Sequence, residues 1–303
     1  MCIRLAPVAI PIMLPPMIPR GFVMKASVSG RFPLFAHSLA IALGLFFTPA
    51  GTLAAQPEPG LPSITVPDGF MVTEAIKPGL IAYPMFGAFD PEGRLFIAES
   101  SGKDIRGAAM AENPKCRIRM LEDTDGNGVF DSSTVFADKI GIPMGILHHQ
   151  GSIFVASPPD FLKLTDSDGD GVAEEREVLL TGWNVRGTAS LHGPFLGPDG
   201  WLYLTDGRHG YNITTKEGTT LKGLASRIWK CRPDGTGLEW FAGGGFDNPI
   251  ELSFTPAGEM IGTMTYFTKP MLGQRDGLMH FIRGGVYSKE HPCVSEFKHS
   301  GEL

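Results

Sequence analysis

The sequence predicts an all-β fold of repeated antiparallel sheets, a β-propeller. A turn rich in glycine followed by a short apolar strand recurs along the 303 residues, and glycine and proline are plentiful, at 39 and 25 residues. Long stretches with the periodicity of an amphipathic helix do not occur in the sequence. Self-similarity at a regular period is the signature of a repeat architecture.

The clearest copy of this unit is LHGPFLGPDGWLYLTDGRHG, residues 191–210. Its turn is Gly197-Pro-Asp-Gly200, in which proline presets one φ angle and glycine is free to take a positive one. The aromatic and aliphatic run Trp201 to Thr205 then predicts a strand.

Three other places repeat this pattern. RLFIAES follows Gly93, SIFVASP follows Gly151 and EMIGTMT follows Gly258. With Gly200, the four turn glycines are separated by 58, 49 and 58 residues, close to the roughly 40 to 50 residues of a propeller blade with some loop insertion. Four blades can therefore be counted directly, and Gly284 to Tyr287 is expected to begin a further strand unit.

The first 55 residues are predicted to lie outside the propeller domain, residues 56–303. Residues 1–23 form an apolar extension dense in proline, upstream of a plausible true start at Met24. Residues 24–55 have the pattern of a secretory signal peptide, with basic residues, an apolar stretch and small residues near Ala55. The alternative is a retained membrane anchor, although the apolar stretch has about 14 residues where a span needs about 20. Either way we expect an exported protein, periplasmic or attached to a membrane by an uncleaved signal.

Charge and cysteine content narrow the function further. The net charge of −6, with no basic stripe, argues against a nucleic-acid partner. Cys116, Cys231 and Cys293 remain after processing, an odd number that allows at most one disulfide. The sequence holds no C-x-x-C-H haem attachment motif, so an electron acceptor, if one exists, lies elsewhere.

Two acidic loops carry a calcium-binding pattern, with oxygen ligands at alternate positions and glycine at the sixth. The predicted ligands are Asp123, Asp125, Asn127 and Asp131 in the first loop, and Asp166, Asp168, Asp170, Val172, Glu174 and Glu177 in the second. Glu177 stands at position twelve, where the first loop has Thr134, so we expect the second loop to bind calcium more tightly. Both loops are flanked by strand patterns, so the ions would staple hairpins; the alternative is a solvated turn without an ion.

These motifs together resemble the membrane-bound dehydrogenase family, which is related to the soluble quinoprotein glucose and sorbosone dehydrogenases. The resemblance rests on PDGFMVTEAIKPGL, FGAFDPEGRLFIAES, the two DxDG loops, GPDGWLYLTDGRHG and DNPIELSFTPAGE. It implies a six-bladed propeller, of which this chain would hold about four to five blades. It also implies pyrroloquinoline quinone (PQQ) and calcium over the central channel, with a histidine that takes the proton of the substrate hydroxyl while hydride passes to the quinone.

Carried across residue by residue, the resemblance assigns the catalytic histidine to His192. Arg208 occupies the place of an aspartate that orients this histidine, and Asp206, two residues earlier on the strand, could substitute for it. Asn248 matches a segment whose arginine contacts the quinone, but Asp247 stands at the arginine's place, where an anion would repel the quinone's carboxylates. His209 is a further cofactor-binding candidate. The alternative is that both histidines are structural residues at strand ends.

The sequence therefore predicts an exported, calcium-stapled propeller that oxidises an alcohol or sugar hydroxyl, with an acceptor such as a cytochrome c on a missing segment or another chain. A first alternative is a noncatalytic propeller that binds carbohydrate or a protein partner, which Arg208 and Asp247 favour. A second is a metal-dependent lactonase-like hydrolase, which would need carboxylates to converge at the channel mouth. Its candidates are Glu99, Asp206, Asp247 and Glu251.

Overall fold

The computed structural model describes residues 64–103, 109, 112–185, 190–224, 226–244, 248–266 and 275–287. The chain divides into two compact units, of which the larger runs from Ala75 to Leu303 and contains every strand described below. The predicted extension and signal peptide, residues 1–55, lie outside the described residues, as do Asp247 and Cys293. Within the described ranges, no helix has the length and apolar character needed to cross a membrane.

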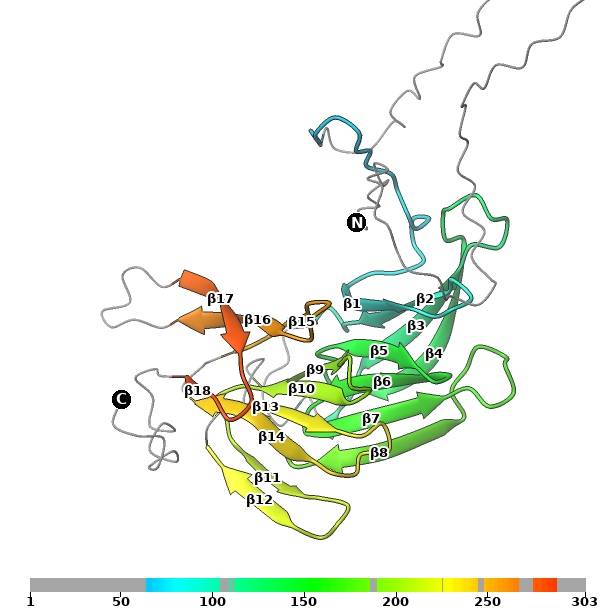
Figure 1. The fold of residues 1–303 in the computed structure, drawn as a ribbon. Coiled ribbons are helices and arrows are strands. Elements are labelled where there is room, and N and C mark those ends of the chain that lie inside the picture. The colour runs from blue at the N-terminus through cyan, green and yellow to red at the C-terminus, as the bar shows by residue number, and fades with distance from the viewer. Residues whose placement is uncertain are drawn as a thin grey trace, which may run out of the picture. The chain divides into compact units, whose positions relative to one another are not determined.

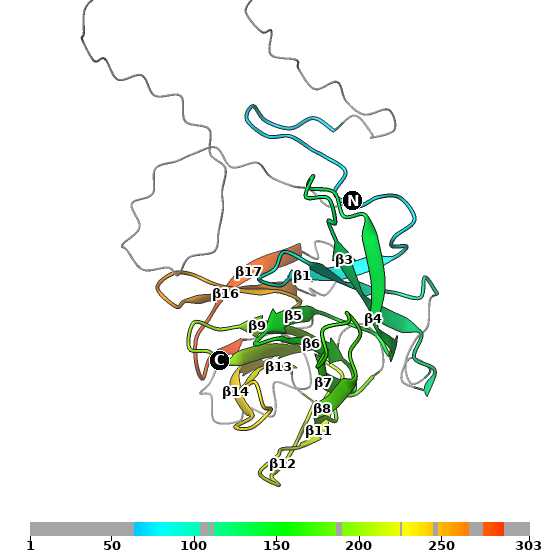
Figure 2. The ribbon, with the colours of Figure 1, turned by 90° about the vertical axis from the view of Figure 1, so that its right-hand side faces the viewer.

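The fold is all β, and its strands form consecutive antiparallel sheets that we number as blades 1 to 4 (Figures 1 and 2). Blade 1 contains β1 (Pro84–Phe89), β2 (Leu95–Glu99), β3 (Cys116–Glu122) and β4 (Ser132–Ile140). Blade 2 contains β5 (Ile146–His149), β6 (Ser152–Ser157), β7 (Asp160–Thr165) and β8 (Glu175–Thr181). Because each blade pairs its strands in chain order, each is an up-and-down sheet of the propeller type.

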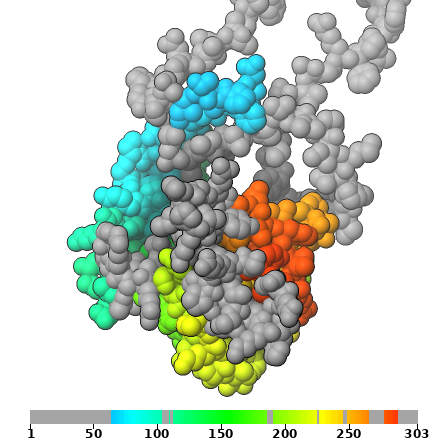
Figure 3. Space-filling view, turned by 90° about the vertical axis from the view of Figure 1, so that its left-hand side faces the viewer, coloured from blue at the N-terminus to red at the C-terminus, as the bar shows by residue number. Residues whose placement is uncertain are grey.

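Blades 3 and 4 continue this order with two additions. Blade 3 contains β9 (Leu191–Leu196), β10 (Leu202–Asp206), β13 (Ser226–Cys231) and β14 (Glu239–Gly244), with the hairpin β11 (Tyr211–Thr214) and β12 (Thr220–Gly223) inserted. The yellow hairpin lies at the lower rim in Figure 3. Blade 4 contains β15 (Leu252–Phe254), β16 (Met260–Tyr266) and β17 (Arg275–Phe281).

Strand β18 (Val286–Tyr287) corrects one expectation about the repeat. It does not begin a new unit but pairs in parallel with β14, at the outer edge of blade 3. The pairing aligns Val286 with Gly243, and Gly243 also donates its NH to the carbonyl of Gly285. A Cβ on Gly244 would collide with the backbone of Tyr287, so glycine at this edge lets the returning chain approach β14 closely.

The four predicted turn glycines are confirmed as the corners of the blades. Gly93, Gly151, Gly200 and Gly258 each lie between the first and second strand of a blade, with φ of +88°, +75°, +78° and +86°. This is the left-handed region, which a residue with a Cβ enters only at a cost of about 1 kcal/mol or more. The turn chemistry visible in the sequence therefore marks the first hairpin of each blade correctly.

Most of the core lies between successive blades. Because side chains alternate along a strand, β10 sends Leu202 and Leu204 to one side, where they pack with Trp183 of the segment after blade 2. It sends Tyr203 to the other side, where it packs with Leu252 and Phe281 of blade 4. Such burial of both faces is what makes a blade depend on its neighbours.

The register of the strands defines two ends of the sheets. At one end, which we call the turn end, Leu95 pairs with Leu121 and Ser152 pairs with Thr165, so the turn glycines and both acidic loops lie there. The opposite end carries the termini of the second strands, where Glu99 pairs with Arg117 and Asp206 with Arg227. The predicted calcium loops and the predicted catalytic residues therefore lie at opposite ends of the blades.

Candidate functional site

The segments that carry the predicted residues His192 and Asn248 meet at one point in the structure. His192 in β9 is fully buried, and its Nε2 lies 2.9 Å from Oδ1 of Asn248, which follows β14. Thr205 is the cross-strand partner of His192, and its hydroxyl donates a hydrogen bond to the carbonyl of Pro249. The connection from blade 3 to blade 4 is thereby anchored to the face of blade 3 that carries His192.

This contact determines the proton on His192. An amide oxygen only accepts hydrogen bonds, so Nε2 carries the hydrogen and donates to Asn248. In a neutral imidazole the acceptor nitrogen is then Nδ1. The partner that orients this ring through Nε2 is therefore an uncharged amide rather than the carboxylate predicted from the sequence.

Asp206 does not orient His192, so that expectation is wrong. It pairs with Leu191 in β9 and with Arg227 in β13, and lies on the opposite face of the blade, toward blade 2. The residue is fully buried, and neither carboxyl oxygen accepts a hydrogen bond of normal length from a described residue. Burial raises the pKa of the Asp206 carboxyl well above its ordinary value; nearby Trp229, Arg227 and the NH of Gly207 only partly offset this effect.

Glu99 holds the equivalent place in blade 1, six residues after the turn glycine. It is 1% exposed and accepts hydrogen bonds from the NH of Ala82 at 2.7 Å, from Nε of Arg119 at 2.9 Å and from Arg117. Burial alone would raise the pKa of Glu99, but these hydrogen bonds outweigh it and lower the pKa. The same position thus carries a carboxylate that two arginines hold ionised in blade 1, and a carboxyl whose burial raises its pKa in blade 3.

The other predicted residues are more dispersed. Arg208 is exposed and His209 half-buried in the segment between β10 and β11, where the carbonyl of His209 accepts a hydrogen bond from Nδ2 of Asn184. The lactonase-like alternative needs carboxylates that converge. Glu99 and Asp206 instead lie in different blades, and the described residues contain one group of potential metal ligands, in the second acidic loop.

A central cavity of about 570 Å³ lies between the first strands of all four blades. Its lining comprises Phe86 to Phe89, Met144 to His148, Gly193 to Leu196 and Ile250 to Phe254. These residues are mostly apolar, and the ionisable ones are His148 and Glu251. Desolvation raises the pKa of Glu251. His192 itself does not line this cavity, although the residues that follow it do.

The described lining does not fit PQQ. This quinone carries several carboxylates, which require cationic or hydrogen-bond-donating partners when they leave water. No lysine or arginine occurs among the described residues of the cavity, and Glu251 would repel an anion. The sequence predicts that Asp247 repels the carboxylates of PQQ, and the described wall of the cavity disfavours them as well. No reaction step is therefore assigned to the quinone.

The second acidic loop gathers four of its predicted ligands. Side-chain oxygens of Asp166, Asp168, Asp170 and Glu174 lie within 4.8 Å of one another. Asp166 accepts hydrogen bonds from the NH groups of Gly169 and Gly171, which shape the turn, and Val172 donates its NH to Asp170. Glu177 does not join this cluster. It lies within β8, where its carboxylate accepts a hydrogen bond from Nζ of Lys216 at 2.8 Å.

The first acidic loop has the same backbone pattern but a different charge. Asp123 accepts from the NH groups of Asn127 and Gly128, and Asp166 in the second loop likewise accepts from two NH groups of its turn, those of Gly169 and Gly171. Asp131 takes the position of Glu174, and its carboxylate lies 3.3 Å from Nζ of Lys77. Its hydrogen bonds from Thr124 and the contact with Lys77 lower the pKa of Asp131. A lysine thus supplies positive charge to the first loop, and nothing in the sequence near that loop indicated it.

Several solved structures are similar to this chain, among them two described as dehydrogenases. A Thermus thermophilus protein described as an oxidoreductase (glucose dehydrogenase) is 21% identical, with a TM-score of 0.47, over 71% of this chain and 65% of that chain. A PQQ-bound aldose sugar dehydrogenase from Streptomyces coelicolor is 15% identical, with a TM-score of 0.45, over 67% and 61%. A Trichoderma reesei carbohydrate-active enzyme of family AA12 is 14% identical, with a TM-score of 0.49, over 72% and 57%.

The chain thus spans about three fifths of the length of these structures, and no curated protein matches it. The model of one protein family matches residues 56–279, which include all of blades 1 to 3 and most of blade 4. The β-propeller described above therefore belongs to the family described as Domain of unknown function (DUF7133).

Proposed function

We propose that this propeller binds a small uncharged sugar or alcohol in its central cavity. The observation that carries the proposal is the lining of the cavity, which combines apolar strand residues with few polar groups in about 570 Å³. Small-molecule sites in proteins are concave, mostly apolar and polar at a few defined positions. Four blades contribute to the cavity, so it is the place where the fold brings distant segments together.

Two groups of the lining would recognise hydroxyls. The Glu251 carboxylate accepts hydrogen bonds, and the His148 imidazole both donates and accepts when neutral. The rings of Phe86, Phe195 and Phe254 offer apolar surface to the carbon skeleton of such a ligand. With one carboxylate and no described lysine or arginine, the cavity disfavours anions and accommodates a neutral polyol.

A second candidate function is the oxidation of the bound hydroxyl, which would make the protein an oxidoreductase. The contact between His192 and Asn248 favours it, because the structure joins the two motifs that resemble the quinoprotein dehydrogenases. His192 does not line the cavity, so this function requires the hydroxyl to reach Nδ1 of a neutral His192, which is the accepting nitrogen when Nε2 donates to Asn248. The electron acceptor, such as a cytochrome c, would lie on another segment or chain, and export to the periplasm belongs to the same proposal.

Calcium would have a structural role in this protein. The four carboxylate ligands of the second acidic loop suit a hard cation with oxygen ligands. Since the loop lies at the turn end, between β7 and β8, an ion there would hold the hairpin together and offset repulsion among the carboxylates. It would not reach the residues at the opposite end of the blades.

Isothermal titration of the full chain tests the main proposal, with D-glucose, glycerol, D-glucuronate and PQQ as separate ligands. We expect heat from the neutral ligands, loss in Glu251→Gln of the part of that heat that comes from the central cavity, and no change in the exposed strand variant Glu175→Gln. Tight binding of PQQ would contradict the proposal that the cavity takes uncharged ligands, and would support a quinone cofactor there. Reduction of a dye by glucose with added PQQ and calcium, abolished in His192→Gln, would support the second candidate function.

A further inference from the structure

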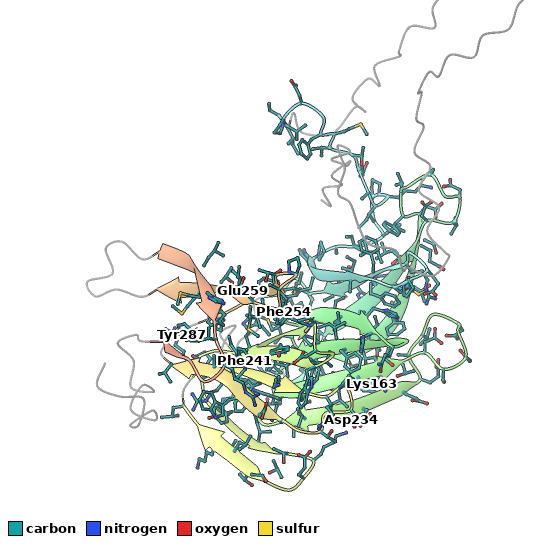
Figure 4. All side chains as sticks on the ribbon, in the orientation of Figure 1. Lys163, Asp234, Phe241, Phe254, Glu259 and Tyr287 are labelled. Carbon is teal, nitrogen blue, oxygen red and sulfur yellow. The ribbon has the colours of Figure 1, made fainter. Side chains whose placement is uncertain are left out.

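A second cavity, of about 320 Å³, lies between blades 3 and 4 at the turn end, and we call it the turn-end cleft. Its lining comprises Pro198, Asp199, Tyr203, Phe241, Phe254, Gly258, Glu259, Met260, His280, Phe281, Ile282 and Arg283. Figure 4 labels Phe241 of β14, Phe254 of β15 and Glu259, which come from the two blades that form the cleft. Its volume is at the lower end of the range of about 300 to 1,000 Å³ for ligand sites.

Aromatic rings form the wall of the turn-end cleft. The ring of Tyr203 packs edge-on against Phe241, with centroids 5.6 Å apart, and lies 5.1 Å from the ring of Phe254. Tyr203 is almost fully buried, whereas Phe241 and Phe254 are half-buried and retain accessible surface. Rigid aromatic surface of this kind packs well against the C–H groups of a sugar ring.

The rim of the cleft carries hydrogen-bonding groups that are held in place. Asp199 Oδ2 accepts a hydrogen bond from the Tyr203 hydroxyl at 2.9 Å, and Lys230 Nζ lies 3.9 Å from the same oxygen. Glu259 supplies a second exposed carboxylate and His280 an exposed imidazole. Arg283 also lines the cleft, but Nη2 of its guanidinium already pairs with Glu239 at 3.0 Å.

Blades 1 and 2 form an equivalent cleft that is built differently. There Phe96 and Phe136 repeat the edge-on pair of Tyr203 and Phe241, with centroids 5.0 Å apart. Phe96 has no hydroxyl, and the imidazole of His148 stacks on it at 6.2 Å. The aromatic pair is thus a general feature of the blade interface, whereas the tyrosine hydroxyl that positions an aspartate occurs in the turn-end cleft.

We propose that the turn-end cleft is a second ligand site, which binds a single uncharged sugar ring. Sugar hydroxyls donate to carboxylates and accept from an imidazole, so Asp199, Glu259 and His280 match their chemistry. Two carboxylates at the rim and an arginine already paired disfavour anionic sugars. Phe254 lines both this cleft and the central cavity, but Asp199 belongs to the cleft alone and Glu251 to the central cavity alone.

Saturation-transfer NMR and isothermal titration of the full chain with D-glucose test the proposal, with D-glucuronate as the anionic comparison. We expect glucose binding at the cleft to weaken about tenfold or more in Asp199→Asn, because a hydrogen bond to a charged acceptor is lost. Glu92→Gln changes the equivalent turn of blade 1 and should leave binding unchanged. If Asp199→Asn lowers the melting temperature, Tyr203→Phe is used as the test variant instead. It removes the hydroxyl that holds Asp199, and phenylalanine already occupies the equivalent position in blade 1.

The outcomes separate this site from the central cavity. Loss of glucose binding in Asp199→Asn but not in Glu251→Gln, or two sites per chain that the two variants remove one at a time, supports the turn-end cleft. A number of glucose sites and an affinity that are the same in Asp199→Asn, in Tyr203→Phe and in the unmodified chain overturn it, whatever happens to the central cavity. Absence of glucose binding by the unmodified chain, or equal binding of glucuronate at the cleft, overturns it as well.

Discussion

Nε2 of His192 lies 2.9 Å from Oδ1 of Asn248, and this contact fastens blade 3 to the connection that leads into blade 4. The two residues are 56 positions apart in the chain. His192 is fully buried, so the amide partner satisfies a group that water cannot reach. The contact therefore has a structural consequence whether or not the histidine takes part in chemistry.

Replacement of Asn248 by alanine should destabilise the protein. A buried donor that loses its acceptor costs about 1 to 3 kcal/mol, and for a domain of this size each kcal/mol lowers the melting temperature by about 2 to 4 °C. Calorimetry measures the shift. Asn113→Ala, at an exposed position, is the matched control and should melt with the unmodified chain. Equal melting of both variants would show that the contact contributes nothing.

Replacement of Asp206 by asparagine should change the pH dependence of stability. Since the folded pKa of Asp206 lies above its unfolded value, the folded state binds its proton more tightly. The resulting stability is present below the unfolded pKa and is lost as the pH rises toward the folded pKa. Between about pH 4 and pH 8, the melting temperature of Asp206→Asn should therefore rise relative to that of the unmodified chain as the pH increases. A constant difference across this range would refute the shift.

Replacement of Glu99 by glutamine should have the opposite pH dependence. The folded pKa of Glu99 is lowered, so its stabilisation is present above the unfolded pKa and disappears as the pH falls through the folded one. Near neutral pH, the loss should be about 2 to 4 kcal/mol, because Arg119 and Arg117 lose their shared carboxylate. Chemical denaturation at neutral and acidic pH measures it. An unchanged midpoint at neutral pH would contradict the role of this cluster.

Removal of calcium should lower the melting temperature through the second acidic loop. Asp168→Asn should abolish the difference between melts with calcium and with a chelator, because one of four clustered carboxylates loses its charge. Asp125→Asn makes the matching change in the first loop, where Lys77 already supplies positive charge, and should preserve most of the difference. If the unmodified chain melts at the same temperature with calcium and with a chelator, calcium does not stabilise the protein.

The sequence predicted the blades because their corners are local. A turn that needs positive φ favours glycine wherever it occurs, so Gly93, Gly151, Gly200 and Gly258 were visible without any knowledge of packing. The strands that flank the acidic loops followed from the same alternation of turns and apolar runs. These features depend on a few neighbouring residues, and the structure confirms them.

The arrangement of the site depended on register, which the sequence does not display. An irregularity between Tyr203 and Thr205 makes Thr205, not Asp206, the partner of His192, so the aspartate faces the other blade. Position twelve of the second acidic loop predicts Glu177 as a calcium ligand. However, β8 already begins at Glu175, so Glu177 lies within a strand beside Lys216.

Hydrogen exchange measured with and without D-glucose shows which strands a bound ligand protects. We expect slower exchange with glucose in the first strands that line the central cavity, above all in β5 and β15, and loss of that protection in Glu251→Gln. Unchanged exchange in those strands at saturating glucose would contradict a ligand site in the central cavity.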